Sequence, residues 1–185
     1  MPNYCNNSLK LRHDDPAMID RAMKAFQEGK LLEEFVPVPT ELKETMAGHY
    51  GDGYKRELHE FTQQLNIKYF GYANWYDFAV AEWGTKWDVS EPQYTENKDG
   101  SVTIWFDTAW APPMPIYEEL EAQGFEVEAT YCEQGVGYAG WYADGEDNEH
   151  SISFWDDTED CDDIANMEAF FQDHGLTHSP AHTGG

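Results

Sequence analysis

The sequence predicts an α+β domain in which helices pack on one face of an antiparallel sheet. Two observations support this class. Alternating apolar and polar residues predict several strands in the second half of the chain, and segments with apolar residues at helical spacing lie between and before them. The 185 residues, of which 41% are hydrophobic and 15% aromatic, suffice for one domain or two small parts that share a core.

The first 70 residues are expected to form a strand followed by helices. Residues 4–11 alternate as a short strand, and Asp15-Pro16 then supplies a helix N-cap followed by proline at the first helical position. Thr40 is expected to cap a short helix that ends at Gly48. Residues 55–67 are predicted to form a longer helix, with Leu58, Phe61 and Leu65 on one stripe.

A second part is expected from residue 71 onward, although the two parts can equally form one continuous domain. Asn74 is the predicted cap of a helix whose tryptophans and Phe78 face inward. The motif E-W-G-T-K-W-D, residues 82–88, follows, with Gly84 where a left-handed helix C-cap requires glycine. We interpret this motif as a joint between a helix and a strand that begins at Trp87.

Strands and one helix alternate through the rest of the chain. Asp99-Gly100 predicts a hairpin turn. The expected elements are strands at 101–110 and 125–132, a helix at 116–123 between them, strands at 137–143 and 150–155 on either side of an acidic turn at 144–149, and a last helix capped by 160–163. Strand–helix–strand–strand units on one antiparallel sheet favour a ferredoxin-like arrangement for residues 71–185.

The charge is very unevenly distributed. The chain has 36 Asp and Glu against 11 Lys and Arg, a formal net charge of −25. Residues 1–98 hold 16 acids and all 11 bases, whereas residues 99–185 hold 20 acids and no Lys or Arg. Nucleic acid is excluded as a direct ligand because its phosphates are repelled. A basic protein surface is the partner that this charge favours.

The candidate partner-binding residues are the carboxylates of three acidic segments in the second half. They are Glu118, Glu119, Glu121, Glu126, Glu128, Asp144, Glu146, Asp147, Glu149, Asp156, Asp157, Glu159, Asp160, Asp162 and Asp163. Duplex DNA carries about one charge per 1.7 Å of axis, so twenty net charges correspond to about ten base pairs. A compact chain of this length is on the order of 40 Å across, so mimicry of a short duplex is physically possible.

Simpler explanations account for the other candidate sites, and no catalytic, cofactor or metal site is predicted. A calcium loop beginning at Asp157 has Asp162 where glycine is required, so helix capping explains these carboxylates better. A zinc site of three histidines spaced four apart (174, 178, 182) is interrupted by glycine and proline. A pairing of Cys132 with His150 as nucleophile and base has no local support.

A cytoplasmic, non-membrane protein is expected. The N-terminus lacks an apolar leader, and no run reaches the roughly 18 apolar residues of a membrane span. The cysteines at positions 5, 132 and 161 are odd in number and widely spaced, which favours free thiols in a reducing compartment.

Three segments carry a resemblance to a known family. The opening MPNYCNNSLKL, the run NWYDFAVAEWGTKWD at 74–88 and SVTIWFDTAWAPP at 101–113 resemble the YubB-like family. Its members are small phage-, prophage- and plasmid-encoded proteins with a C-terminal ferredoxin-like domain. The resemblance implies a fold and a mobile-element source, with no catalytic residues to carry over.

Charge and resemblance together predict a non-enzymatic mobile-element protein. Its carboxylates would bind a basic, nucleic-acid-handling partner, in the manner of a DNA-mimic inhibitor of a host defence complex of the anti-CRISPR or anti-restriction type. The alternative is a general binding or scaffold module of a phage or plasmid whose acidity serves solubility only.

Overall fold

A computed structural model describes residues 3–89 and 93–151 of the chain. In chain order the described elements are β1 (Tyr4–Arg12), α1 (Pro16–Gln27), α2 (Leu31–Phe35), α3 (Thr40–Lys43), α4 (Tyr54–Phe70), α5 (Trp75–Phe78), the π-helical turn η1 (Ala79–Trp83), β2 (Gln93–Glu96), β3 (Val102–Ala109), α6 (Met114–Ala122), β4 (Glu126–Glu133), β5 (Tyr138–Ala143) and β6 (Glu146–Ser151).

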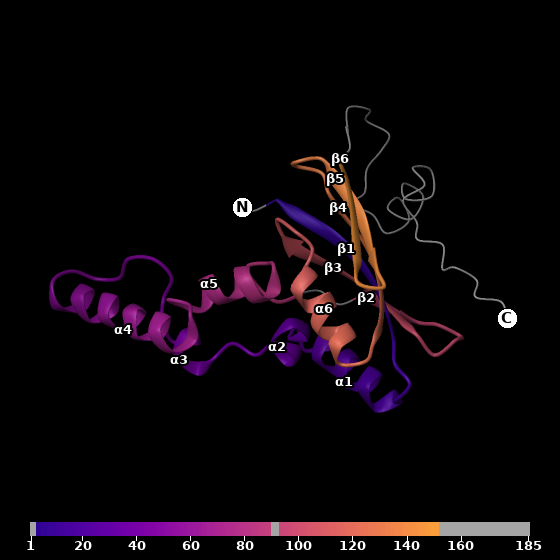
Figure 1. The fold of residues 1–185 in the computed structure, drawn as a ribbon, viewed down its shortest axis with the longest axis horizontal. Coiled ribbons are helices and arrows are strands. Elements are labelled where there is room, and N and C mark those ends of the chain that lie inside the picture. The colour runs from indigo at the N-terminus through magenta and orange to yellow at the C-terminus, as the bar shows by residue number, and fades with distance from the viewer. Residues whose placement is uncertain (1–2, 90–92, 152–185) are drawn as a thin grey trace.

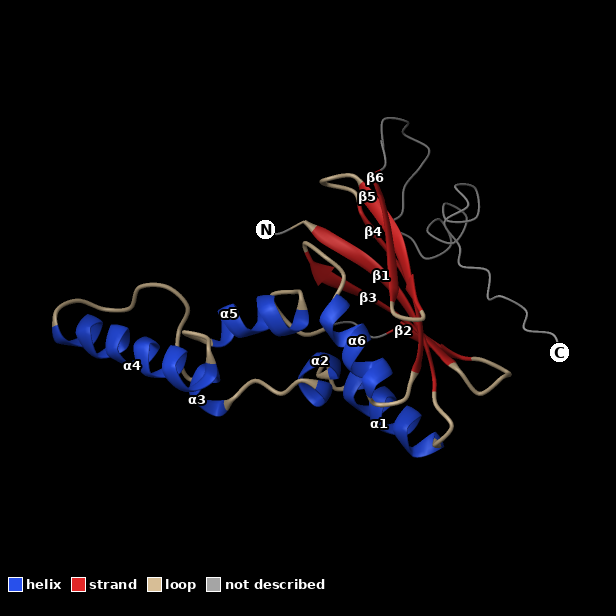
Figure 2. Cartoon of the chain, viewed as in Figure 1, coloured by secondary structure: helices blue, strands red, loops and turns tan. Residues whose placement is uncertain are grey.

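The strands form one six-stranded sheet in the order β2-β3-β1-β4-β5-β6, and all neighbouring pairs are antiparallel. Helical segments connect β1 to β2 and β3 to β4 (Figure 2). The order β2-β3-β1-β4 is the one that two interlocked strand–helix–strand units produce, and the hairpin β5–β6 extends the sheet beyond β4. The α+β class and the antiparallel sheet are therefore confirmed.

The described helices lie on one side of the sheet (Figure 1). Strand β1 alternates between buried and half-buried residues, so Leu9 and Leu11 point toward the helices. They join one hydrophobic cluster with Phe26 of α1, Leu32 of α2 and Leu120 of α6. Helices on one face of the sheet are thus confirmed.

The central strand β1 comes from the first 70 residues, and its two neighbours, β3 and β4, come from the second part. The division at residue 70 itself stays a prediction.

The predicted cap and first position of α1 are confirmed, because the Asp15 carboxylate accepts the Ala17 N–H at 2.9 Å and Pro16 opens the helix.

Two predicted starting points were wrong. Helix α3 begins at Thr40 itself, because the Pro39 carbonyl accepts the first helical N–H groups, and it ends at Lys43 rather than Gly48. No strand begins at Trp87, since the neighbouring Asp88 carboxylate caps α2 instead, and the next described strand starts at Gln93.

The acidic turn predicted at 144–149 was also placed wrongly. The turn comprises only Asp144 and Gly145, both with positive φ, as in a two-residue hairpin loop. The chain from Glu146 to Ser151 is strand β6, so most of these acids lie on a strand. The strand predicted at 150–155 overlaps β6 at two residues, and the rest of it lies outside the described residues.

The E-W-G-T-K-W-D motif ends a helical segment at Gly84, as predicted, but it does not lead directly into a strand at Trp87. Gly84 ends η1 in the left-handed conformation, with a φ of 76°. The indole N–H of Trp83 donates to the Val36 carbonyl at 2.8 Å. The Thr85 hydroxyl accepts the Ala109 N–H at 2.9 Å and ties the joint to the end of β3. Lys86 lies over the half-buried ring of Trp87, 4.8 Å from its centroid.

Cysteine chemistry differs from the expectation at one position. Cys5 is a buried free thiol on β1, and burial raises its pKa to about 12. Cys132 on β4 is disulfide-bonded, which corrects the prediction of a free thiol there.

Among the described helices, none combines the length and the apolar character that crossing a membrane requires.

Candidate functional site at an acidic edge of the sheet

Helix α6 and the β5–β6 hairpin meet at a shared carboxylate. Glu121 of α6 accepts a hydrogen bond from the Tyr142 hydroxyl at 2.7 Å through Oε2. Its Oε1 accepts the Gly145 N–H at 3.2 Å, so the helix holds both strand β5 and the hairpin turn. The exposed carboxylate of Asp144 lies in that turn, next to Gly145.

Strand β6 adds two more carboxylates on the same side of the sheet. Asp147 is opposite Tyr142, and Glu149 is opposite Gly140, so both belong to the helix-side set of residues. The Tyr131 hydroxyl of β4 donates to Asp147 Oδ1 at 2.5 Å. We name Glu118, Glu121, Asp144, Asp147 and Glu149 the acidic edge.

Carboxylates of the acidic edge raise the pKa values of two tyrosines, Tyr131 and Tyr142. Burial raises the pKa of Tyr142, and the bonded Glu121 and the charges of Glu118 and Asp147 raise it further. Burial also raises the pKa of Tyr131, with the bonded Asp147 and the charge of Glu149 adding to it. Asp147 therefore acts on both phenols, while the α6 carboxylates act on Tyr142 and Glu149 acts on Tyr131.

The described basic side chains that form ion pairs do so away from the acidic edge. Five ion pairs join described side chains, and none of them includes Glu118, Glu121, Asp147 or Glu149. Glu118, Asp147 and Glu149 are exposed. Because hydrogen bonds from phenols do not cancel a negative charge, the acidic edge presents its carboxylates to solvent as a group of like charges.

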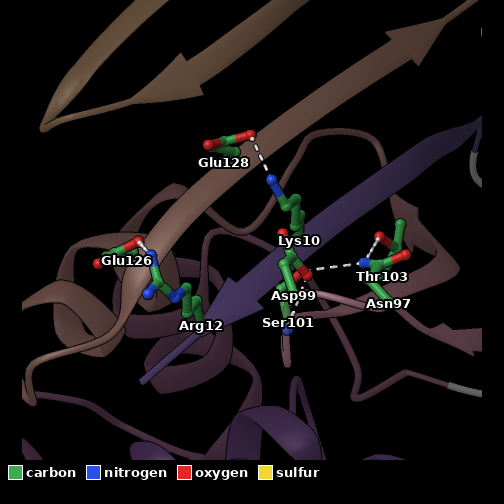
Figure 3. A network of polar contacts seen from close by, with 8 residues as sticks. All are labelled: Lys10, Arg12, Asn97, Asp99, Ser101, Thr103, Glu126 and Glu128. Atoms are coloured by element: carbon green, nitrogen blue, oxygen red, sulfur yellow. Dashed lines mark hydrogen bonds and ion pairs between the residues drawn. The ribbon is translucent and has the colours of Figure 1, made fainter. Parts of the chain in front are cut away.

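Two predicted carboxylates belong to the opposite face and are neutralised there. Glu128 pairs with Lys10 at 3.4 Å, and Glu126 pairs with Arg12 at 3.3 Å (Figure 3). A second polar cluster, around the β2–β3 turn, lies beside them. Its contacts are those of Asn97 with Ser101 and Thr103, and of Ser101 with Asp99.

The remaining predicted residues divide into three groups. Glu119 accepts a hydrogen bond from the Gln123 side chain on its own helix at 2.7 Å. Glu146 pairs with Ala143 in the ladder, and it therefore lies on the face away from Asp147. Asp156, Asp157, Glu159, Asp160, Asp162 and Asp163 lie outside the described residues, as do the alternative calcium loop and the three C-terminal histidines.

The metal and nucleophile alternatives gain nothing from the geometry. No group of three His, Cys, Asp or Glu suited to a metal ion occurs among residues 3–89 and 93–151. Cys132 and His150 both pair with Ala139 of β5, from its two sides. Two strand spacings, about 10 Å, therefore separate them, too far for direct proton transfer.

Sequence reasoning missed the two tyrosines that organise the acidic edge. Tyr131 and Tyr142 were treated only as alternating strand residues, and no spacing rule relates Tyr142 to Glu121 of α6. The Asp144-Gly145 dipeptide was an available signal, because it marks a two-residue hairpin loop and places the following acids on a strand. Charged residues on a terminal strand also discourage edge-to-edge pairing, which is a second use for the β6 acids.

Comparison with known proteins finds one family model and one solved structure. Residues 82–172 match the family model of the ferredoxin-like domain in Api92-like protein. The crystal structure of a protein Api92 from Yersinia pseudotuberculosis is similar, with 12% identity and a TM-score of 0.46. The similarity covers 83% of this chain and 99% of that one. No curated protein matches the sequence.

The family match agrees with one part of the resemblance inferred from sequence. The C-terminal ferredoxin-like domain is supported, within the matched residues 82–172. The YubB-like assignment and the phage or plasmid source stay predictions.

Proposed function

We propose that this protein is a non-enzymatic acidic binding protein whose acidic edge docks on a basic surface of a nucleic-acid-handling partner. The specific form is a DNA-mimic inhibitor of a host defence complex, encoded by a mobile element. The grouping of Glu118, Glu121, Asp147 and Glu149 around two tyrosines, with Asp144 in the adjoining turn, is the observation that supports it most.

Charge density favours a surface built to bind nucleic-acid-handling proteins. Such proteins hold phosphates with Lys and Arg, and each phosphate contact adds to a strongly salt-dependent affinity. Carboxylates such as Glu118, Asp147 and Glu149, which are exposed and take part in none of the five ion pairs between described side chains, offer the same sign of charge to those side chains. Fixed carboxylates on a helix and a hairpin lose less conformational entropy on binding than carboxylates on loose loops.

A pair of matched variants tests the acidic edge. Glu118→Gln with Glu149→Gln removes two negative charges from the acidic edge, while Glu126→Gln with Glu128→Gln removes two from the opposite face. A pull-down from host lysate at low and high salt first identifies the partner. A competition assay then measures how strongly each variant displaces duplex DNA from that purified partner.

The edge variant is expected to lose on the order of tenfold or more in competition, and the opposite-face variant to retain it. Binding of the wild type should weaken steeply with salt, since screening acts on exposed charges. Equal behaviour of the two variants, or binding that is independent of salt, would contradict the proposal.

The alternative is a scaffold module whose acidity maintains solubility. Strand β6, which lies at one end of the sheet as far as the chain is described, favours it, because carboxylates on a sheet edge discourage edge-to-edge pairing. In that case the edge variant should lower the solubility limit while its partner binding equals that of the wild type.

A further inference from the structure

The opposite face of the sheet, which points away from the described helices, carries buried side chains that no described helix covers (Figure 1). Cys132 of β4 and Ala139 and Ala143 of β5 lie on this face, because their chain neighbours Tyr131 and Tyr142 point toward the helices. Even so, Cys132 and Ala139 are 0% exposed, and Ala143 is 2% exposed. A layer outside the described residues therefore covers this part of the sheet.

The alternation along β4 shows where the covered area begins. From Val127 to Tyr131 the strand alternates between buried residues on the helix side and half-buried residues on the opposite face. Cys132 breaks this alternation, because it belongs to the opposite face and is nevertheless buried. Its ladder partner on β5 is Ala139, which is equally buried. The cover is therefore centred on these two residues.

Cysteine pairing identifies what covers the face. Cys132 is disulfide-bonded, whereas Cys5 is a free thiol on the helix side of β1. The chain has three cysteines, so Cys161 is the one remaining partner within it. Between Ser151 at the end of β6 and Cys161, ten residues can span about 33 Å, whereas β4 lies two strand spacings, about 10 Å, from β6. The chain is long enough to make this bond.

Residues 152–172 have the composition of a segment that packs on a sheet. Ile164, Met167 and Phe171 recur at the spacing of one helix face, so the sequence predicts an amphipathic helix there. A helix of about ten residues is about 15 Å long, which is the width of about three strands. The family match ends at residue 172, so the matched domain includes this whole segment.

We propose that residues 152–172 dock on the opposite face of the sheet, over β4 and β5, and that a disulfide between Cys132 and Cys161 holds them there. The sheet would then lie between two layers, with the described helices on one face and this segment on the other. A bond to a second copy is disfavoured, because two chains of formal charge −25 repel each other. Cys161 of the same chain is instead present at a high effective concentration.

Docking has a consequence for the charge of the molecule. Cys161 is flanked by the candidate carboxylates between residues 156 and 163, so the disulfide would hold these acids against β4. Carboxylates that sequence alone leaves on a separate segment would then belong to the surface of the same domain as the acidic edge. The docking itself does not rest on the proposed function.

Disulfide mapping of the full chain tests the bond. Glutathione disulfide serves as the oxidant: the two cysteine thiols lose two electrons and two protons, and glutathione disulfide is reduced to two glutathione thiols. Cleavage after glutamate then releases residues 129–133 and 160–168. Mass spectrometry should find these two peptides joined in the wild-type monomer, and separate in Cys161→Ser.

Labelling of Cys132 with N-ethylmaleimide tests the docking without the bond. In Cys161→Ser the docked segment should still shield the Cys132 thiol. Adding Ile164→Asp with Phe171→Asp to this variant should raise the labelling rate of Cys132 on the order of tenfold or more, because charges on the apolar stripe disfavour its burial and the thiol becomes accessible.

Ala165→Asp with Ala169→Asp, also in Cys161→Ser, is the matched control. It adds the same charge on the other side of the predicted helix, so the labelling rate should stay that of Cys161→Ser alone. Cys5 provides an internal reference. It is buried on the helix side of the sheet, so rapid labelling of Cys5 would report that the whole domain had opened.

Three results would overturn the docking. One is a covalent dimer in which Cys132 is bonded to a cysteine of a second chain. Another is a monomer in which Cys132 and Cys161 each form a mixed disulfide with glutathione and none of the linked peptide is found. The third is equal labelling of Cys132 in the two aspartate variants, with Cys5 protected in both. Neither test measures binding to a basic partner, so these results would leave the proposed function standing.

Discussion

The Tyr142 hydroxyl donates to Glu121 at 2.7 Å, and this hydrogen bond joins strand β5 of the β5–β6 hairpin to helix α6. Tyr142 is buried, whereas Glu121 is half-exposed. The bond therefore fixes a carboxylate at the boundary between core and solvent, where it also accepts the Gly145 N–H.

Removal of the Tyr142 hydroxyl is expected to lower the free energy of unfolding by about 1–3 kcal/mol, because the bond is to a charged acceptor. A double-mutant cycle with Tyr142→Phe and Glu121→Gln, followed by urea unfolding, measures the coupling. A coupling free energy near zero would show that the two side chains do not depend on each other.

Alkaline pH should destabilise the protein. Burial raises the pKa of Tyr117, Tyr131, Tyr138 and Tyr142 above the usual value of 10. In the unfolded chain these phenols ionise near pH 10, so the unfolded state binds fewer protons there than the folded state. Their contribution to stability is complete below pH 10 and decreases as the pH rises above it.

Urea unfolding at pH 9 and pH 11, with tyrosinate absorbance followed at each, measures this loss. The Tyr142→Phe variant should lose less stability between the two pH values than the wild type does. Identical losses would show that Tyr142 ionises normally in the folded protein.

Asp88 should prove important for stability even though it lies in a loop. Its carboxylate accepts the N–H groups of Leu32 at 3.0 Å and Glu33 at 2.8 Å, and so caps α2 from a distant part of the chain. Asp88→Ala leaves these N–H groups without that acceptor, and a loss of about 2–3 kcal/mol is expected.

Asp88→Asn is the informative comparison. Burial raises the pKa of Asp88, so the charged form is disfavoured at this site. The neutral amide keeps one acceptor oxygen and avoids the desolvation of a charge. Thermal unfolding should rank the wild type first, Asp88→Asn second and Asp88→Ala last. A reversed order of the two variants would refute the capping role.

Gly84 should tolerate alanine worse than another glycine of similar conformation. A Cβ on Gly84 would lie 3.0 Å from Pro115 Cδ and 3.3 Å from the Pro112 carbonyl oxygen. Gly100 has a φ of 83°, against 76° for Gly84, but no atom within 4 Å of the corresponding position.

Both alanine variants are expected to lose about 1–2 kcal/mol in free energy of unfolding, because alanine disfavours the left-handed backbone conformation. The extra loss in Gly84→Ala, measured by urea unfolding against Gly100→Ala, is expected to be at least about 1 kcal/mol, because backbone and proline atoms cannot easily move away. Equal losses would mean that residues 112–115, at the start of α6, move away from the added Cβ without a measurable loss of stability.

The parts of the fold that local chemistry determines could be read from the sequence. The Asp15-Pro16 cap, the Gly84 stop and the alternation of β4 each depend on a few neighbouring residues, and each was found where expected. The start of α3 was placed one residue off, because the Pro39 carbonyl rather than Thr40 accepts the first helical bonds. The strand predicted from Trp87 was wrong because Asp88 caps α2, a contact with a distant part of the chain that no local pattern contains.

The candidate site was predictable in composition but not in arrangement. The carboxylates stood out by their number, yet the register of β1 with β4 places Glu128 next to Lys10, and the ladder of β5 with β6 places Asp147 next to Tyr142. Residues far apart in the chain set these neighbours. Sequence reasoning alone therefore could not separate acids that form ion pairs, such as Glu128, from acids that accept hydrogen bonds from tyrosines, such as Asp147.

The distance between α4 and the sheet has a consequence for binding. Helix α4 extends away from the sheet along the long axis of the molecule (Figure 1), whereas the acidic edge lies on α6 and the β5–β6 hairpin. A partner held at the acidic edge would therefore leave α4 uncovered.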